Sequence, residues 1–236
     1  MNLEHIYLAF RKRIRLLFFG RYFVICKNGV NYLIDIYSYI DRRIEAYGVY
    51  EYEQLTYFKN NVIRLKSSLV IDCGAHSGLY AVNLIHNIPG IKVIAFEPDD
   101  KNRAHLVANL YLNGMEELVQ VEGVALSAQA GYAKFHRHDK ENPGRSMLTE
   151  NGEYSVVTKT LDEVVKITGE RVAIKVDVEG HELPLLKGAS RLLRENQCFL
   201  QIESFSPGGV FEFLDQLGYS LQKQYGNDYF FEPKNA

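Results

Sequence analysis

Short apolar runs alternate with amphipathic stretches from residue 68 onward. Runs of this kind, bounded by turn residues, are typical of strands buried on both faces of a parallel sheet. They lie at residues 69–71, 92–96, 118–121, 172–177 and 199–203. Helical periodicity predicts helices at residues 80–85, 99–113, 181–195 and 208–217. This alternation predicts an α/β fold with a doubly wound, mostly parallel sheet, which a C-terminal antiparallel hairpin at 220–221 and 228–231 extends to seven strands.

The first part of the chain has a different pattern. Two short apolar stretches, 22–25 and 32–36, flank Asn28-Gly29, a strong hairpin signal. A lead-in helix is expected from Tyr50 to about Asn61. We therefore divide the chain into an N-terminal extension and a main domain. The extension, residues 1–66, holds an amphipathic helix, the hairpin and the lead-in helix; the main domain is 67–236.

The amphipathic helix carries apolar side chains at helical spacing. They are Ile6, Tyr7, Phe10, Ile14, Leu17 and Phe18. Four basic residues within 11–15 interrupt them, which argues against a signal peptide and against a membrane-spanning helix. Counting residues 1–25, five Lys/Arg against Glu4 give a formal charge of +4. Two interpretations stay open: the stripe packs on the core or on a second subunit of a homodimer, or residues 1–25 make weak contact with an anionic membrane surface.

Bulk composition narrows the function classes. The formal net charge is -2, and the chain has no basic tail, zinc-finger spacing or aromatic RNA-binding motif, so no nucleic-acid partner is expected. The three cysteines are far apart, which argues against a disulfide framework and fits a reducing compartment. We therefore expect a cytoplasmic protein, for which any peripheral membrane contact would be with the inner face.

A turn-rich insertion separates the third and fourth predicted strands. Residues 131–136 and 154–158 alternate as strands do, residues 142–145 predict a turn, and Thr160 with Glu163 predicts the capping box of a short helix. The loop 136–151 is either a lid over a substrate or a solvated hairpin tip. Its polar side chains are His136, Arg137, His138, Arg145 and Ser146.

Carboxylates stand at the ends of four buried strands. They are Asp72, Glu97, Asp177 and Glu203. Ligands of doubly wound sheets bind beyond the carboxyl ends of the strands, so we expect these side chains to line one site. A single carboxylate there is often only a helix cap. Four along one edge, beside a glycine loop, indicate a binding site.

The glycine loop Asp72-Cys73-Gly74-Ala75-His76-Ser77-Gly78 indicates a nucleoside cofactor. Glycine at 74 and 78 lets the backbone turn tightly and approach a ligand closely. Glu97, 19 residues after Gly78, can accept hydrogen bonds from both ribose hydroxyls. The spacing differs from the Gly-x-Gly-x-x-Gly of dinucleotide sites, and Asp72 would repel a pyrophosphate. A sulfonium tolerates carboxylates, so S-adenosylmethionine (SAM) is favoured over NAD.

Together these motifs resemble the FkbM family of methyltransferases. The similarity covers roughly residues 30–205, in segments 39–44, 48–51, 70–80, 95–98, 123–127, 160–162 and 174–182. It implies a Rossmann-like class I methyltransferase fold. It also implies SAM-dependent O-methylation, commonly of sugars in surface polysaccharides, glycolipids or natural products.

The resemblance also implies roles for single residues. Asp72 and Gly74 would face the methionine part of SAM, Glu97 the ribose, and Asp99 and Ala125 the adenine. The remaining residues that we expect to contact the cofactor are His76, Gly78, Pro98 and Asp177. His76 stands at a position where relatives often carry Asn.

Methyl transfer to a hydroxyl requires alignment of the acceptor and removal of its proton. Asp177 and His181 are the candidates for the base or for orienting the acceptor, although His181 could equally be a structural residue at a helix start. Asp177, Glu179 and His181 could also ligate a hard cation, but no ligand set converges in the sequence, so no metal is expected. Glu203 could close the acceptor pocket.

These observations predict an O-methyltransferase that acts on a sugar hydroxyl of a polysaccharide, a glycolipid or a glycosylated metabolite. One alternative is a methyltransferase for a non-carbohydrate small molecule or a peptide. Others are a SAM-binding module without turnover and an NAD-dependent oxidoreductase.

Overall fold

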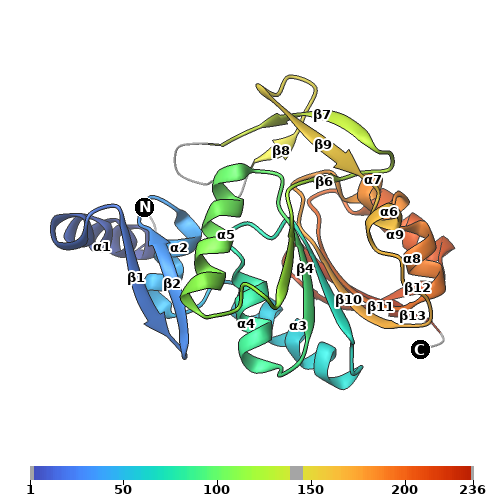
Figure 1. The fold of residues 1–236 in the computed structure, drawn as a ribbon, viewed down its shortest axis with the longest axis horizontal. Coiled ribbons are helices and arrows are strands. Elements are labelled where there is room, and N and C mark those ends of the chain that lie inside the picture. The colour runs from blue at the N-terminus through green and yellow to red at the C-terminus, as the bar shows by residue number, and fades with distance from the viewer. Residues whose placement is uncertain (1–2, 139–145, 235–236) are drawn as a thin grey trace.

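The computed structural model describes residues 3–138 and 146–234; the predicted turn at 142–145, with Arg145, lies outside these ranges. A seven-stranded sheet has the order β12-β13-β11-β10-β3-β4-β5 (Figure 1). Its neighbours pair parallel except β13, which is antiparallel to β11 and β12, so the predicted doubly wound α/β fold is confirmed. The strands are β3 (Leu69–Cys73), β4 (Lys92–Phe96), β5 (Val119–Glu122), β10 (Arg171–Val176), β11 (Gln197–Glu203), β12 (Tyr219–Tyr225) and β13 (Asp228–Pro233).

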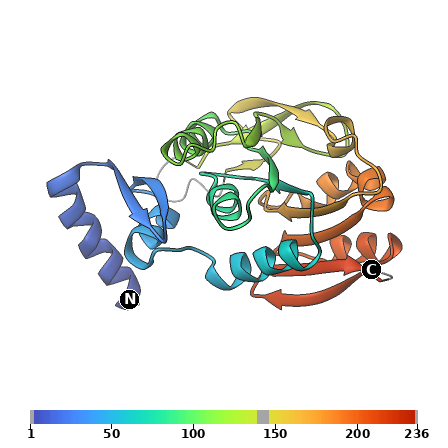
Figure 2. The same cartoon turned by 60° about the horizontal axis from the view of Figure 1, so that its bottom comes forward.

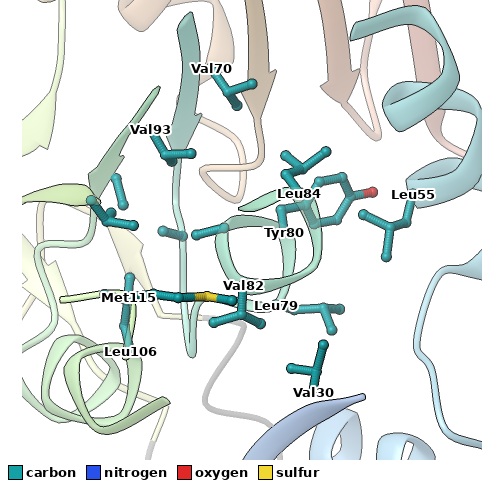
Figure 3. Packing of buried hydrophobic residues seen from close by; sticks show 14 of the residues in the cluster. Val30, Leu55, Val70, Leu79, Tyr80, Val82, Leu84, Val93, Leu106 and Met115 are labelled. Atoms are coloured by element: carbon teal, nitrogen blue, oxygen red, sulfur yellow. The ribbon is translucent and has the colours of Figure 1, made fainter. Parts of the chain in front are cut away.

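Helices cover both faces of this sheet, because successive strand side chains point to opposite sides. Val70 packs with one layer and Ile71 with the other. Figure 3 shows part of the first layer, in which Val70 and Val93 lie among side chains from the helices. The first layer contains α3 (Tyr52–Arg64), α4 (Leu79–Asn87) and α5 (Asp100–Leu112); the second contains α6 (Leu161–Val164), α7 (Glu182–Lys187), α8 (Ser190–Glu195) and α9 (Gly208–Gln216).

The segment before the sheet forms a smaller helix-and-hairpin unit at one extreme of the molecule (Figures 1 and 2). Val30 and Phe58 share a hydrophobic cluster with the main sheet, and the division at residue 66 stays a prediction. The predicted hairpin is present, and the lead-in helix begins at Tyr52 instead of Tyr50 because Glu51 has a left-handed backbone, φ 54°. The unit comprises α1 (Leu3–Phe19), β1 (Tyr22–Lys27), β2 (Val30–Asp35) and α2 (Tyr39–Tyr47).

Helix α2 was not predicted, although the sequence carries signals for both of its ends. Ser38 caps the start by accepting a hydrogen bond from the Asp41 amide, and Gly48 ends the helix in the left-handed conformation. Within the described part of the chain, no helix is long and apolar enough to cross a membrane.

The turn-rich insertion forms a second, four-stranded sheet that lies over one end of the main sheet (Figures 1 and 2). The predicted capping box between Thr160 and Glu163 is present where the insertion returns to α6. The strand order is β6-β9-β7-β8, with β6 (Ala125–Leu126), β7 (Gly131–His136), β8 (Met147–Leu148) and β9 (Tyr154–Lys159).

One buried amide joins the N-terminal hairpin to the glycine loop. The Asn109 side chain, 3% exposed on α5, accepts a hydrogen bond from the Leu33 amide at 2.7 Å. Its Nδ2 donates to the Ser77 carbonyl at 2.8 Å. The position of the loop therefore depends on the hairpin through α5.

We expect Asn109→Ala to lower the free energy of unfolding by about 2 kcal/mol or more, because it leaves the Leu33 N–H and the Ser77 carbonyl without partners. Denaturant unfolding measures the change. The control is Asn87→Ala, which removes one exposed hydrogen bond to the Asn83 carbonyl and should stay within about 0.5 kcal/mol. Equal effects of the two variants would contradict the bridging role.

Candidate active site

A cavity of about 300 Å³ lies at the carboxyl ends of β3, β4, β10 and β11. The strand order reverses between β3 and β10, which is where doubly wound sheets bind ligands. The structure brings together there all four strand-end carboxylates, Asp72, Glu97, Asp177 and Glu203.

The glycine loop passes so close to the end of β10 that position 74 has no room for a side chain. Gly74 has φ 84°, and a Cβ there would lie 1.8 Å from the Asp177 carbonyl oxygen. The amides of Gly74 and Ala75 both donate to the Phe96 carbonyl at 3.0 Å. The loop is therefore clamped between β4 and β10 with its backbone facing the cavity.

Three buried polar atoms of two side chains in the cavity wall have no hydrogen-bond partner in the protein. Neither carboxyl oxygen of Asp72 has a hydrogen-bond partner, although the residue is 1% exposed, and His76 Nε2 is likewise unpartnered. Burial raises the pKa of Asp72 to about 6 and lowers that of His76 to about 4. Buried polar groups are normally satisfied, so both point to a ligand that supplies the missing contacts.

Glu97 combines backbone contacts with free acceptor capacity. Its Oε1 accepts from the Asp99 amide and its Oε2 from the His76 amide, both at 2.8 Å. Burial raises the pKa of Glu97 to about 8, although these hydrogen bonds oppose the shift. Each carboxylate oxygen keeps a second lone pair that can accept from a hydroxyl.

A polar row crosses the central strands beneath the carboxylates. Lys175 on β10 is in register with Asp72 on β3 and with Gln201 on β11. Lys175 Nζ lies 2.9 Å from Asp177 Oδ2 and 4.7 Å from the centroid of the Tyr80 ring. Burial opposes the charge of Lys175, but Asp177 and Asp72 outweigh it and hold the pKa of Lys175 well above its ordinary value.

Two charged residues of this wall, Lys175 and Glu51, were not predicted from the sequence. A lysine inside an otherwise apolar buried strand was a signal for the first. Glu51 comes from the start of α3, and its Oε2 accepts from the Tyr80 hydroxyl at 3.3 Å. Burial raises the pKa of Glu51 to about 7, and Asp177 adds to the shift while Lys175 opposes it. Burial, with Asp177, also raises the pKa of Glu203.

His181 also lines the cavity, at the start of α7. Its Nε2 lies 2.9 Å from the Ser127 hydroxyl, and burial lowers its pKa, which favours the neutral imidazole. Within residues 3–138 and 146–234, no group of three or more His, Cys, Asp or Glu side chains is arranged to hold a metal ion.

Another part of the wall is apolar and comes largely from the small sheet. Ser146 lines it, and Arg137 ties the insertion to α5 through ion pairs with Asp99 and Asp100. His136 instead faces Glu153 at the surface, and the His138 amide donates to Ser146. The apolar members are Pro98, Val124, Ala125, Leu126, Phe135, Met147 and Leu148.

Two of the expected cofactor residues, Gly78 and Asp99, lie just outside this wall. Gly78 closes the loop by donating to the Ala75 carbonyl and starts α4 with φ 80°. One oxygen of Asp99 caps α5 by accepting from the Lys101 and Asn102 amides, and the other meets Arg137. Both residues therefore hold the backbone around the cavity in place without lining the cavity themselves.

The residues present fit SAM. The unpartnered carboxylate of Asp72 suits its ammonium group, Glu97 has acceptors for ribose hydroxyls, and the apolar wall suits a purine. The seven-stranded sheet with β13 reversed and this cavity at its switch point together define a class I SAM-dependent methyltransferase. SAM is the cofactor.

Comparison with known proteins gives the family. The methyltransferase FkbM domain matches residues 72–221, and the chain belongs to that family. A relative, methyltransferase sdnD from Sordaria araneosa, is 30% identical over 212 residues, which cover 73% of this chain and 80% of the relative.

Solved methyltransferases resemble the chain at low sequence identity. A ribosomal protein L11 methylase from Lactobacillus delbrueckii subsp. bulgaricus is 15% identical, with a TM-score of 0.47, over 78% of this chain and 79% of that one. A precorrin-6y C5,15-methyltransferase from Geobacter metallireducens GS-15 is 16% identical, with a TM-score of 0.46, over 76% and 86%.

We expect Gly74→Ala to abolish SAM binding measured by calorimetry, because the new methyl group would overlap the Asp177 carbonyl. The matched control is Gly90→Ala: Gly90 has φ 80° but nothing within 4 Å of a Cβ. It should cost only the left-handed strain of about 1 kcal/mol and leave affinity unchanged. Retained binding in Gly74→Ala would show that the loop tolerates a side chain.

We expect SAM affinity to fall as the pH drops through about 6. Below that pH Asp72 is protonated in the free protein, so binding of an ammonium group must release its proton. Calorimetry in two buffers of different ionisation enthalpy measures the release. Asp72→Asn should weaken binding at least tenfold at pH 7 and remove the proton release near pH 6, while Asp215→Asn on exposed α9 should change neither. Proton release that persists in Asp72→Asn would assign it to another group.

Proposed function

We propose that the protein transfers the methyl group of SAM to a hydroxyl oxygen of a sugar, carried by a polysaccharide, a glycolipid or a glycosylated metabolite. The observation that carries the proposal is the group of carboxylates around Lys175, where β10, β11 and α3 meet at the cavity. Carboxylates are strong acceptors for the many hydroxyls of a sugar.

The wall divides between a cofactor side and an acceptor side. We assign Asp72 to the ammonium group of SAM, Glu97 to the ribose, and the apolar wall around Pro98 and Ala125 to the adenine. When bound, SAM supplies an electrophilic methyl group on a positively charged sulfur. Because Gly74 has no side chain, the loop can pack directly against the end of β10, which leaves room for the cofactor at the strand ends.

Aromatic rings stand beside the acceptor carboxylates. Tyr39, Tyr50 and Phe205 line the same cavity as Asp177 and Glu203, and Phe205 is 67% exposed. Flat aromatic faces pack against the apolar C–H faces of sugar rings, while carboxylates accept from the ring hydroxyls. This combination supports a sugar over an apolar acceptor.

Three groups can serve proton removal. Asp177 accepts from Lys175 Nζ at 2.9 Å, which fixes the side chain in place and suits it to orienting the acceptor hydroxyl. Burial lowers the pKa of His181 and favours its neutral form, which can accept a proton. Glu51 has its pKa raised to about 7, the range in which a general base works best at neutral pH. We assign the base to Glu51 and orientation to Asp177 and His181.

The same carboxylates argue against a nucleic acid as acceptor. A phosphate backbone would approach Glu51, Asp177 and Glu203 with one buried cation, Lys175, among them. The other acceptors, a non-carbohydrate metabolite or a peptide, and SAM binding without turnover are alternative outcomes of a screen for methyl acceptors.

A screen of nucleotide sugars, oligosaccharides, peptides and RNA for release of S-adenosylhomocysteine tests the proposal. We expect release with a hydroxyl-bearing sugar, and mass spectrometry should place the new methyl group on oxygen. Release with peptides or RNA alone would overturn the sugar assignment. A protein that binds SAM and turns over none of these pools would be a binding module.

With the acceptor found, we expect Glu51→Gln to lower kcat by about 10²–10⁴-fold and leave the Kd for SAM unchanged. In the native enzyme kcat should rise as the pH increases through about 7, because Glu51 accepts a proton only when ionised. The variant should lose that limb of the pH profile. The control, Glu53→Gln on the exposed first turn of α3, should behave as wild type. An unchanged pH profile in Glu51→Gln would move the base to His181.

A further inference from the structure

Helix α1 turns its apolar face away from the protein. Only Leu8 is buried. Leu3, Leu17 and Phe18 are 83%, 81% and 77% exposed, and Phe10 is 61% exposed. At 100° per residue these side chains fall on one face, together with Ile6, Tyr7 and Ile14, which are also exposed. The expectation that this stripe packs on the chain's own core is therefore wrong.

The charged side of the same helix faces the protein and fixes this orientation. The Glu45 side chain on α2 is 1% exposed and accepts from Arg11 Nε at 2.9 Å and Arg15 Nε at 2.8 Å. Arg43 on α2 pairs with Glu4. Rolling α1 to bury its apolar face would leave Glu45 buried and unpaired, which is strongly unfavourable.

An aromatic side chain of helix α2 adjoins the exposed face. Tyr47, at the end of α2, packs against Tyr7 with ring centroids 6.1 Å apart and is 48% exposed. An exposed apolar face of this kind on a folded monomer marks an interaction site.

The charge around this surface identifies the kind of partner. Residues 3–27 contain six Lys/Arg against Glu4, a formal charge of +5, whereas the remainder of the chain carries −7. Arg11 and Arg15 share one carboxylate while staying 28% and 31% exposed. Exposed Arg13 borders the apolar face on the side opposite Arg11.

We propose that α1 docks in the plane of an anionic phospholipid membrane, with its apolar face among the acyl chains and its basic flanks at the headgroups. An apolar face with Phe and Leu, flanked by basic residues, is the pattern of helices that lie in the membrane interface. A second copy fits less well, because stripe-to-stripe pairing would bring two segments of +5 together.

Co-sedimentation with lipid vesicles tests the proposal without any methyl acceptor. We expect binding to vesicles of equimolar phosphatidylcholine and phosphatidylglycerol, weaker binding to phosphatidylcholine alone, and a loss of binding as salt is raised. Phe10→Asp should lower the partition coefficient roughly tenfold or more. Its matched control is Ala9→Asp, which places the same charge one residue away, on an exposed part of the helix outside the stripe.

The role of the basic flank has its own pair of variants. Arg13→Glu should weaken binding to anionic vesicles, while Arg194→Glu, exposed at the end of α8, should leave it near wild type. Thermal unfolding should be unchanged in all four variants, because each substituted side chain is exposed. Equal effects of Phe10→Asp and Ala9→Asp, or equal binding to neutral and anionic vesicles, would overturn the proposal. The proposal would also be overturned if the protein bound neither kind of vesicle and light scattering showed a dimer that Phe10→Asp converts to a monomer.

Discussion

The site depends on one buried ammonium group, that of Lys175. It stands in a strand whose other side chains, apart from exposed Arg171, are apolar and buried, and it lies in register between Asp72 and Gln201. Its positive charge offsets part of the repulsion among Asp72, Asp177 and Glu51, which line the same cavity, since a buried charge needs a counter-charge close by. The strand pairing of the fold therefore fixes the electrostatics of the cavity.

Asp72 and Asp177 lie at the same edge of the sheet but differ in their contacts. Asp72 lacks any hydrogen-bond partner in the protein and is balanced only at a distance by Lys175, so it can receive a cation. Asp177 is paired directly with Lys175. In the proposed function, this contrast between an unpartnered and a paired carboxylate at the ends of neighbouring strands separates binding of the cofactor from orientation of the acceptor.

The strands and the strand-end carboxylates could be predicted because both follow from periodicity and from the rule that parallel strands end at a common edge. Glu51 could not, because no local pattern says that the start of α3 folds over the cavity. The orientation of α1 could not be predicted either. Its spacing shows which residues share a face, but Glu45, on another helix, decides which face turns inward. Helix α2 was missed because a short helix leaves little periodicity to detect, although Ser38 and Gly48 marked its ends.

The cavity wall begins before the matched domain does. The FkbM domain match starts at residue 72, yet Tyr39, Tyr50 and Glu51 already line the cavity. In the proposed function, the surface that receives the methyl acceptor therefore lies partly outside the matched domain. A comparison of acceptor preference between relatives would have to include residues 39–51 as well as the domain itself.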